Sequence, residues 1–335
     1  MGKKVNLKER RVIRDAMNLD SGKGLIRFVK AIFYTTLLIE LLGAFLSFPA
    51  FFRDYPLPRA IGLSLFHSVA SFNNSGFDVL GNGTSLIPYQ KDVFLNLVTC
   101  ALVIAGGIGF PVIFELPQKH FSWKRLSMHT RVVLSTTFAL LLFGTLLLKL
   151  TENISWLGAF FYSVSARTAG FSTYNLGDFS TAGLLVVSGL MFIGASPAST
   201  GGGIKTTTFF VLLSGIYSAA TNHSERAFHS AIPKDAFRKA SVISMLAVFL
   251  VMTASYLMLI FDPQLSLRDV LFEMISAFST SGLSTGITSQ LSAQSRILSI
   301  IMMYIGRLGP LTVASLWYFT IGERVRYPEG TIAIG

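Results

Sequence analysis

The chain has 335 residues, of which 51% are hydrophobic and 13% charged, against about 25% charged residues in soluble domains. One water-soluble domain cannot bury that much apolar surface, so we expect a polytopic membrane protein with spans of about 20 helical residues. The net charge of +11 could reflect binding to anionic lipid, binding to nucleic acid, or basic cytoplasmic loops, and the positions of the basic residues decide between these. The only cysteine is Cys100, which excludes a disulfide framework and a thiolate metal cluster.

The first thirty residues carry nine Lys and Arg and no apolar core of a signal peptide, so we expect them to stay in the cytoplasm. Within them, segment 5–17 mixes apolar and basic residues, which indicates a short amphipathic helix that anchors at the membrane surface or docks a partner. Six long apolar runs follow, at 31–52, 91–114, 131–150, 181–219 with a break, 240–261 and 293–320.

Six spans return the C-terminus to the side of the N-terminus. Most of the 28 Lys and Arg residues then fall in the four segments that this topology places in the cytoplasm: 1–30, 116–130, 220–239 and 321–335. This distribution satisfies the positive-inside rule. The excess of basic residues therefore indicates a membrane protein with both termini in the cytoplasm, and no nucleic-acid partner is needed to explain this excess.

Three apolar stretches, at 59–73, 154–167 and 266–279, are too short to span a membrane. Each leads into a glycine segment, and these read Asn74-Ser75-Gly76-Phe77, Thr168-Ala169-Gly170-Phe171 and Thr280-Ser281-Gly282-Leu283. A second glycine motif follows each at a similar distance: Gly106-Gly107-Ile108-Gly109, Gly194-Ala195-Ser196-Pro197 and Gly306-Arg307-Leu308-Gly309. The chain thus repeats one unit three times: span, re-entrant helix, glycine segment, span.

Such a unit suits a cation pore. Irregular backbone at membrane depth must be buried in protein or line a watery cavity. Each short helix precedes its glycine segment, so its partly negative carbonyl end points at that segment and favours a cation. Glycine permits backbone angles that turn carbonyls inward, and rings of carbonyls can replace the water shell of an ion.

With these motifs the chain resembles the Trk/Ktr/HKT superfamily of potassium transporters, most closely the KtrB membrane subunits of its Ktr branch. The resemblance implies an all-α polytopic fold of membrane-pore-membrane repeats, here six transmembrane helices and three re-entrant pore helices in part of a pseudo-fourfold channel. It implies K⁺ coordination, mainly through backbone carbonyls, by Asn74, Ser75, Gly76, Phe77, Thr168, Ala169, Gly170, Phe171, Thr280, Ser281, Gly282 and Leu283.

The resemblance also implies K⁺ uptake by a multi-pass homodimer in the plasma membrane, with a KtrA-like nucleotide-binding ring on the cytoplasmic side. Potassium is then the substrate, Na⁺ is left open as an activating or coupled ion, and no bound cofactor is expected. Family members have four repeats, whereas this chain has three, at 31–115, 131–219 and 240–320, which match the second, third and fourth. We therefore expect an N-terminally truncated sequence.

The break in the fourth apolar run contains three glycines and a proline, a composition that interrupts a helix. By resemblance, 195–204 is an intramembrane gating loop beneath the filter, and the gate comprises Gly201, Gly202, Gly203, Lys205 and Arg307. The alternative is a cytoplasmic loop between two short helices. A phosphate-binding loop is excluded because Ile204 separates Gly203 from Lys205.

Arg307 lies deep in the last span, where a charge is costly unless it faces water or a partner. By resemblance it bonds carbonyls of the gating loop; the alternative is pairing with an acid. Glu40 is expected to be a hydrogen-bonded structural residue rather than an ion ligand, and Asp78 either attracts cations at the outer mouth or is an ordinary loop residue. His67 and Arg167 are expected to brace the loop backbone from behind.

Two other functions remain open from the residues. A secondary transporter of another small polar solute or cation would use broken spans, but it does not require repeated short helices ending in glycine. A membrane-embedded enzyme would need acid, base or metal-binding residues at one depth, and the spans offer only the isolated Glu40 and Arg307. We therefore expect a transporter and not an enzyme.

Overall fold

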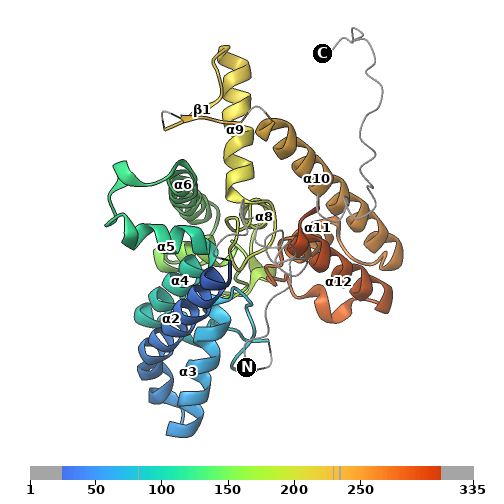
Figure 1. Ribbon diagram of the computed structural model, residues 1–335. Coiled ribbons are helices and arrows are strands. Elements are labelled where there is room, and N and C mark those ends of the chain that lie inside the picture. Colours follow the sequence, from blue (N-terminus) through green and yellow to red (C-terminus); the bar gives the residue numbers. More distant parts are fainter. Residues whose placement is uncertain (1–24, 82, 229, 234, 311–335) are drawn as a thin grey trace.

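The computed structural model describes residues 25–310 except 82, 229 and 234, and this part is mostly helical, as predicted (Figure 1). The expected amphipathic segment 5–17, the end of the last span and the tail 321–335 lie outside the described residues. One addition to the all-α prediction is a small antiparallel hairpin of β1 (Arg226–Ala227) and β2 (Ser230–Ala231) in the segment 220–239. It projects beyond the helices together with the end of α9 (Figure 1).

The N-terminal repeat (31–115) contains α2 (Leu25–Asp54), the re-entrant α3 (Leu57–Phe72), α4 (Val93–Gly107) and α5 (Phe110–Gln118). Helices α2 and α3 pack side by side (Figure 1). The predicted span 91–114 is not straight, because α4 and α5 meet at an angle of 98°. The bend lies at Gly109, whose φ of 90° is readily adopted only by glycine.

The middle repeat (131–219) contains α6 (Met128–Thr151), the re-entrant α7 (Trp156–Ser165), α8 (Thr181–Phe192) and α9 (Thr206–Thr221). The C-terminal repeat (240–320) contains α10 (Ala236–Phe261), the re-entrant α11 (Leu267–Ser279) and α12 (Ala293–Leu308). Short 3-10 helices lie in the connections, at Ile87–Tyr89, Trp123–Arg125, Leu176–Asp178 and Ile287–Gln290. All three re-entrant helices thus lie within a few residues of the predicted stretches.

In the described part of the chain, three helices are long and apolar enough to cross a membrane: Ile26–Asp54, Met128–Thr151 and Ala236–Phe261. The bent pair of α4 and α5 counts as a fourth if it forms one span. These long helices turn large apolar side chains outward, including Phe45, Leu150 and Phe249, as lipid-facing surfaces do. The first span of each repeat is therefore continuous, and the second is broken in the N-terminal and middle repeats.

Polar side chains fix where many of these helices begin. At each of these starts a side-chain oxygen accepts a hydrogen bond from a backbone N–H of the first turn, and the capping residues are Asp92, Ser127, Ser155, Ser180, Ser266 and Ser292. Caps of this kind contribute about 1 kcal/mol each. They place the start of re-entrant helices α7 and α11 at a defined distance from the glycine segment that follows.

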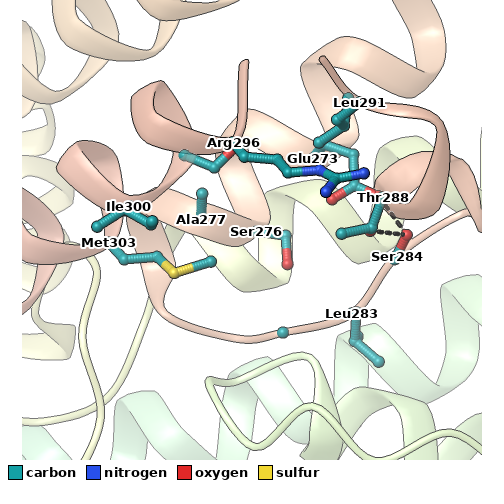
Figure 2. A pocket seen from close by; sticks show the side chains of 12 residues that line it. Glu273, Ser276, Ala277, Leu283, Ser284, Thr288, Leu291, Arg296, Ile300 and Met303 are labelled. Carbon is teal, nitrogen blue, oxygen red and sulfur yellow. Dashed lines mark hydrogen bonds between the residues drawn. The ribbon is translucent and has the colours of Figure 1, made fainter. Parts of the chain in front are cut away.

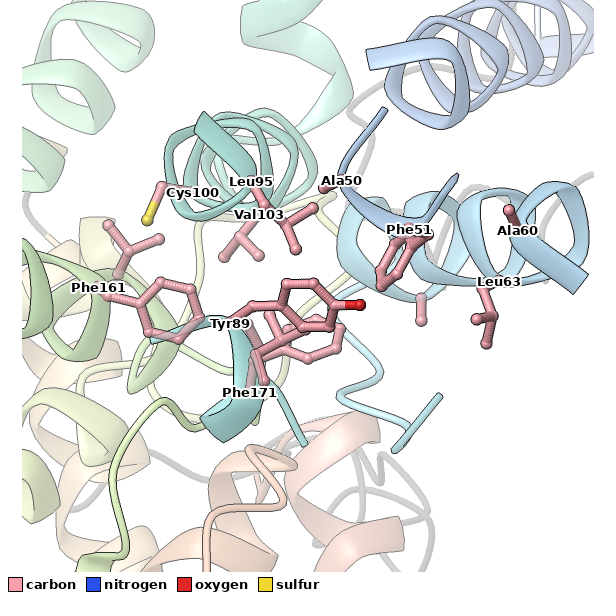
Figure 3. Close-up of a cluster of buried hydrophobic side chains, with 14 residues drawn as sticks. Ala50, Phe51, Ala60, Leu63, Tyr89, Leu95, Cys100, Val103, Phe161 and Phe171 are labelled. Carbon is pink, nitrogen blue, oxygen red and sulfur yellow. The ribbon is translucent and has the colours of Figure 1, made fainter. Parts of the chain in front are cut away.

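An aromatic core joins the N-terminal repeat to the middle repeat (Figure 3). The Phe51 ring lies 5.4 Å from the Tyr89 ring and 5.6 Å from the His67 ring. The His67 ring in turn lies 5.4 Å from Phe171, which directly follows Gly170. Because lipid is as apolar as these rings, tight packing rather than exclusion of water holds them together. This core fixes one glycine segment against the helices of the neighbouring repeat.

Candidate cation filter and gate

The three glycine segments (74–77, 168–171 and 280–283) share one backbone conformation. In each, φ is positive at the first residue and at the glycine: 50° and 61° at Asn74 and Gly76, 77° and 82° at Thr168 and Gly170, and 56° and 84° at Thr280 and Gly282. Side chains disfavour this region, and glycine adopts it freely. The repeat seen in the sequence is therefore also a repeat of local geometry.

This alternation decides where backbone oxygens can point. In a regular extended strand successive groups point to opposite sides. A positive φ at every second residue turns alternate peptide planes over, so that consecutive carbonyls can face the same side. The N–H groups are used elsewhere, since Ser75, Gly170 and Ser281 each donate a hydrogen bond to the carbonyl five residues earlier in the preceding helix. The segments therefore keep carbonyl oxygens available for an ion.

The glycine segments meet one another although about a hundred residues separate them in the chain. A Cβ added to Gly76 would lie 2.4 Å from the carbonyl oxygen of Ala169, and one added to Gly170 would lie 2.1 Å from that of Ser281. Each of these glycines thus packs against the backbone oxygen of the next repeat. The three predicted segments therefore lie next to one another.

The arrangement is open on one side. Among the described residues, nothing lies within 4 Å of a Cβ added to Gly282. The segment around Gly76 is also open, since Ser75 is exposed and Phe77 is 62% exposed. The residues equivalent to Phe77 in the other two segments, Phe171 and Leu283, are only 1% and 2% exposed. The described residues therefore surround the glycines over part of a ring, from Ser75 round to Gly282.

Glycines of the second motif allow close approach behind the segments. A Cβ on Gly106 of α4 would lie 1.8 Å from the carbonyl oxygen of Phe72, and one on Gly306 of α12 would lie 1.7 Å from that of Phe278. Phe72 and Phe278 each precede their segment glycine by four residues. The two repeats thus share this contact, which only a residue without a side chain permits.

The 195–204 loop lies between α8 and α9 and contacts all three repeats. Ser196 and Thr200 donate backbone hydrogen bonds to Gly107 and Gly106, at 3.0 and 3.2 Å. A Cβ on Gly201 would lie 2.0 Å from the Thr168 hydroxyl, and one on Gly202 would lie 2.6 Å from the Thr280 hydroxyl. The loop therefore lies directly against the first residues of two glycine segments.

Two cationic side chains hold this loop. Lys205 donates a hydrogen bond from Nζ to the carbonyl oxygen of Gly201 at 2.7 Å. Arg307, on α12, donates to the carbonyl oxygen of Thr200. Of the predicted gate residues, Gly201 and Gly202 touch the glycine segments, and Gly203 has a φ of 71° at the end of the loop. The expected contact between Arg307 and a loop carbonyl is present.

Two predicted acidic residues have local hydrogen-bonding partners. Glu40 of α2 accepts a hydrogen bond from the Asn73 amide at 2.6 Å, which ties α2 to the end of re-entrant helix α3. Asp78 accepts bonds from the backbone N–H groups of Leu80 and Gly83, at 3.0 and 2.8 Å. The structure thus gives Glu40 the structural partner that the sequence favoured, and it uses Asp78 to organise the loop after Gly76.

His67 and Arg167 contact helices rather than the loop backbone they were expected to brace. His67 Nε2 lies 2.9 Å from the Thr99 hydroxyl of α4, and Arg167 donates to the Thr137 hydroxyl of α6 at 3.4 Å. Both side chains are buried behind the glycine segments. The expected loop bond is instead made at Ser165, whose hydroxyl donates to the carbonyl oxygen of Phe171. Sequence reasoning missed Ser165, because serine is common in helices of this kind.

Comparisons with known proteins agree with this architecture. The family model TrkH, described as a cation transport protein, matches residues 3–318. The chain is 34% identical to the Ktr system potassium uptake protein B of Bacillus subtilis, over 100% of this chain and 77% of that protein. It is 33% identical to the potassium/sodium uptake protein NtpJ of Enterococcus hirae, over 99% of this chain and 77% of that protein.

A solved structure shares the fold. The potassium transporter TrkH of Vibrio parahaemolyticus superposes with a TM-score of 0.73, covering 92% of this chain and 68% of that one, at 18% sequence identity. The match of the family model extends over nearly the whole chain, from the basic N-terminal segment through α12. The chain therefore belongs to the TrkH family of cation transport proteins.

Proposed function

We propose that this protein is the ion-translocating subunit of a potassium uptake system, with the glycine segments as its selectivity filter. The observation that carries the proposal is the meeting of three segments that share the same alternation of positive φ, Gly76 against Ala169 and Gly170 against Ser281. Backbone oxygens in such an arrangement can replace the water shell of a dehydrated cation. The names of the relatives, potassium uptake and potassium/sodium uptake proteins, support K⁺ as substrate and keep Na⁺ as a second candidate ion.

In this proposal the 195–204 loop is the gate. The loop lies against Thr168 and Thr280, the first residues of two glycine segments. It therefore blocks the path of an ion that leaves the filter on this side. Hydrogen bonds from Lys205 and Arg307 hold it there. To open the pore, the loop must break its hydrogen bonds to Lys205 and Arg307. A KtrA-like cytoplasmic ring, bound to a homodimer of this chain, triggers this movement. The basic segments 1–30, 116–130, 220–239 and 321–335 face the cytoplasm.

We further propose that the working filter contains a fourth glycine segment between Gly282 and Ser75. The exposure of Ser75 and Phe77 and the free space at Gly282 support this. The two curated relatives compared above are longer, since the chain covers 77% of each. With four carbonyl-bearing segments an ion can be surrounded on all sides, whereas three leave it open to water or lipid on the fourth.

The test is ⁸⁶Rb⁺ uptake by bacteria that lack their own potassium uptake systems. The chain is expressed with a KtrA-like subunit, both as it stands and with a fourth membrane-pore-membrane repeat placed before residue 1. We expect uptake by the four-repeat protein that unlabelled K⁺ inhibits more strongly than Na⁺. Failure of that protein to transport Rb⁺ would refute the function. Equal uptake by both proteins would refute the need for a fourth segment.

A further inference from the structure

Each re-entrant helix carries, near its middle, a buried polar side chain that contacts a segment just beyond a filter glycine. In all three helices this residue follows a phenylalanine, in the pairs Phe66-His67, Phe161-Tyr162 and Phe272-Glu273. The exposed fractions of His67, Tyr162 and Glu273 are 0%, 0% and 8%. His67 and Glu273 lie nine residues before their segment glycine and Tyr162 lies eight before its own, so three chemically different side chains occupy nearly the same place in the repeat.

Tyr162 of α7 holds the backbone of Tyr174, four residues after Gly170. Its hydroxyl donates to the carbonyl oxygen of Tyr174 at 2.5 Å and accepts from the N–H of the same residue at 3.1 Å. The Tyr174 hydroxyl in turn donates to Ser155, the cap of α7, at 3.2 Å. Both polar groups of one backbone unit are therefore occupied by a side chain of the helix that precedes the filter.

Glu273 of α11 also contacts the chain after its glycine, but it bonds side-chain hydroxyls rather than backbone groups. Its Oε1 accepts hydrogen bonds from the hydroxyls of Ser284 and Thr288, the latter at 3.0 Å. Ser284 lies two residues after Gly282. The carboxylate lines a cavity of about 250 Å³, across which Arg296 extends toward Glu273 and Thr288 (Figure 2). One carboxylate oxygen thus binds two residues of the chain that follows the C-terminal glycine segment.

His67 of α3 reaches across to the neighbouring repeat. Its Nε2 lies 2.9 Å from the Thr99 hydroxyl, which fixes the ring in place, and its ring lies 5.4 Å from that of Phe171. Phe171 directly follows Gly170. The chain after Gly170 is therefore held at two points, at Phe171 by packing against His67 and at Tyr174 by hydrogen bonds to Tyr162.

We propose that Tyr162 and Glu273 are positioning residues of the filter, which set the carbonyl positions by fixing the chain beyond each glycine. The inference rests on the proposed filter function. Selection between K⁺ and Na⁺ depends on the distance and number of coordinating carbonyls and on how firmly they are held. A helix is rigid, whereas the segment after a positive-φ glycine has no regular structure of its own. A side chain that links the helix to this segment restricts the movement of the segment, and with it the movement of the adjoining carbonyls.

The first experiment is hydrogen–deuterium exchange on purified protein in detergent and K⁺, which needs no transport. Tyr162→Phe removes only the hydroxyl that bonds Tyr174. We expect faster exchange of peptides covering 171–176 in this variant. The control is Tyr256→Phe, the same change at an exposed position of α10. Unchanged exchange at 171–176 in Tyr162→Phe would overturn the positioning role, whether or not the protein transports K⁺.

The second experiment measures how strongly K⁺ and Na⁺ each inhibit ⁸⁶Rb⁺ uptake by the four-repeat protein. We expect the preference for K⁺ to fall roughly fivefold in Tyr162→Phe, the equivalent of one lost hydrogen bond. Glu273→Leu should lower the K⁺ preference by a similar factor. Glu273→Gln should have a K⁺ preference closer to that of the parent protein, because its amide oxygen can replace Oε1 as hydrogen-bond acceptor. A merely structural role would lower the amount of folded protein and leave the preference unchanged.

The two experiments separate the possible failures. Parent protein without Rb⁺ uptake refutes the proposed function, and the exchange data still decide whether Tyr162 fixes the segment. Parent uptake with an unchanged K⁺ preference in both Tyr162→Phe and Glu273→Leu overturns the inference alone. A larger loss in Glu273→Gln than in Glu273→Leu overturns it for Glu273, because charge rather than hydrogen bonding would then be the important property.

Discussion

Arg307 donates a hydrogen bond to the backbone carbonyl of Thr200, 107 positions earlier in the chain. Lys205 bonds the adjacent carbonyl, that of Gly201, so two cations hold consecutive peptide groups of one loop. Both groups lie beneath the glycine segments, since a Cβ on Gly201 would touch the Thr168 hydroxyl. Because Arg307 belongs to the C-terminal repeat and the loop to the middle repeat, this contact couples the position of the loop to the packing of two repeats.

Replacing Arg307 with glutamine in the four-repeat protein should raise Rb⁺ uptake in the absence of the cytoplasmic partner. Hydrogen bonds to charged groups contribute about 1.5–3 kcal/mol, so their loss shifts a closed loop toward the open state by roughly ten- to a hundredfold. Arg238→Gln, an exposed arginine on α10, is the matched control. Lower or unchanged partner-free uptake in Arg307→Gln would contradict the gating role of this contact.

Gly106→Ala should destabilise the protein, because its Cβ would lie 1.8 Å from the Phe72 carbonyl and backbone would have to move. Overpacking of this kind costs about 1–3 kcal/mol. Gly62→Ala places the same methyl group on α3 with nothing within 4 Å, and should stabilise the helix by about 0.5–1 kcal/mol. Thermal unfolding in detergent distinguishes the two. A melting temperature of Gly106→Ala at or above that of the parent would rule out the close contact.

Gly170→Ala should lower both the rate and the K⁺ preference of uptake. The residue has a φ of 82°, and the new methyl group would lie 2.1 Å from the Ser281 carbonyl oxygen, so this oxygen of the proposed filter must move. The control is Gly81→Ala, which has a φ of 90° and open space around the added Cβ. It imposes similar backbone strain outside the filter. An equal loss of selectivity in both variants would mean that strain alone, and not the filter contact, is responsible.

Acid should weaken the connection between the end of α10 and the start of α12 through Asp262. The nearby Ser295 hydroxyl, together with hydrogen bonds from the backbone N–H and the hydroxyl of Ser292, holds the pKa of Asp262 below its usual value. An aspartate in an unfolded chain has a pKa of about 3.9. Its stabilising contribution is therefore complete above about pH 4 and is lost as pH falls through the lower folded pKa.

Asp262→Asn provides the comparison for this pH dependence. Melting temperatures of the parent and the variant, measured in detergent from pH 7 down to pH 3, should differ most at neutral pH and converge in acid. A constant difference across the range would show that the protonation of Asp262 does not contribute. A shift confined to pH values above 5 would point to a group other than an aspartate with a lowered pKa.

The sequence was informative wherever a local rule applied. Apolar length identified the three re-entrant stretches, and the glycine that ends each stretch marked a backbone with positive φ, as at Gly76, Gly170 and Gly282. The expectation that Arg307 bonds a carbonyl of the 195–204 loop came from the resemblance, and that bond is present; its gate role remains a proposal. The bend between α4 and α5 was not foreseen, because Gly109 sits in a run that is apolar on both sides.

Buried partners of polar side chains were the least predictable feature. His67 and Arg167 were recognised as structural residues, yet their partners, Thr99 and Thr137, lie on helices far away in the sequence. Tyr162 and Glu273 gave no signal of their own, since tyrosine and glutamate in an apolar helix can equally face lipid headgroups or water. Only their hydrogen bonds to Tyr174, Ser284 and Thr288 distinguish them.

The sequence by itself determined the membrane class, the threefold repeat, the re-entrant helices and the glycine backbone, because hydropathy and φ preference are properties of short stretches of chain. Only the tertiary structure decided that Gly76 meets Ala169, that Gly170 meets Ser281, and that Gly202 lies against Thr280. Such contacts join residues that are far apart in the chain. They depend on how whole helices pack, which no single stretch of sequence specifies.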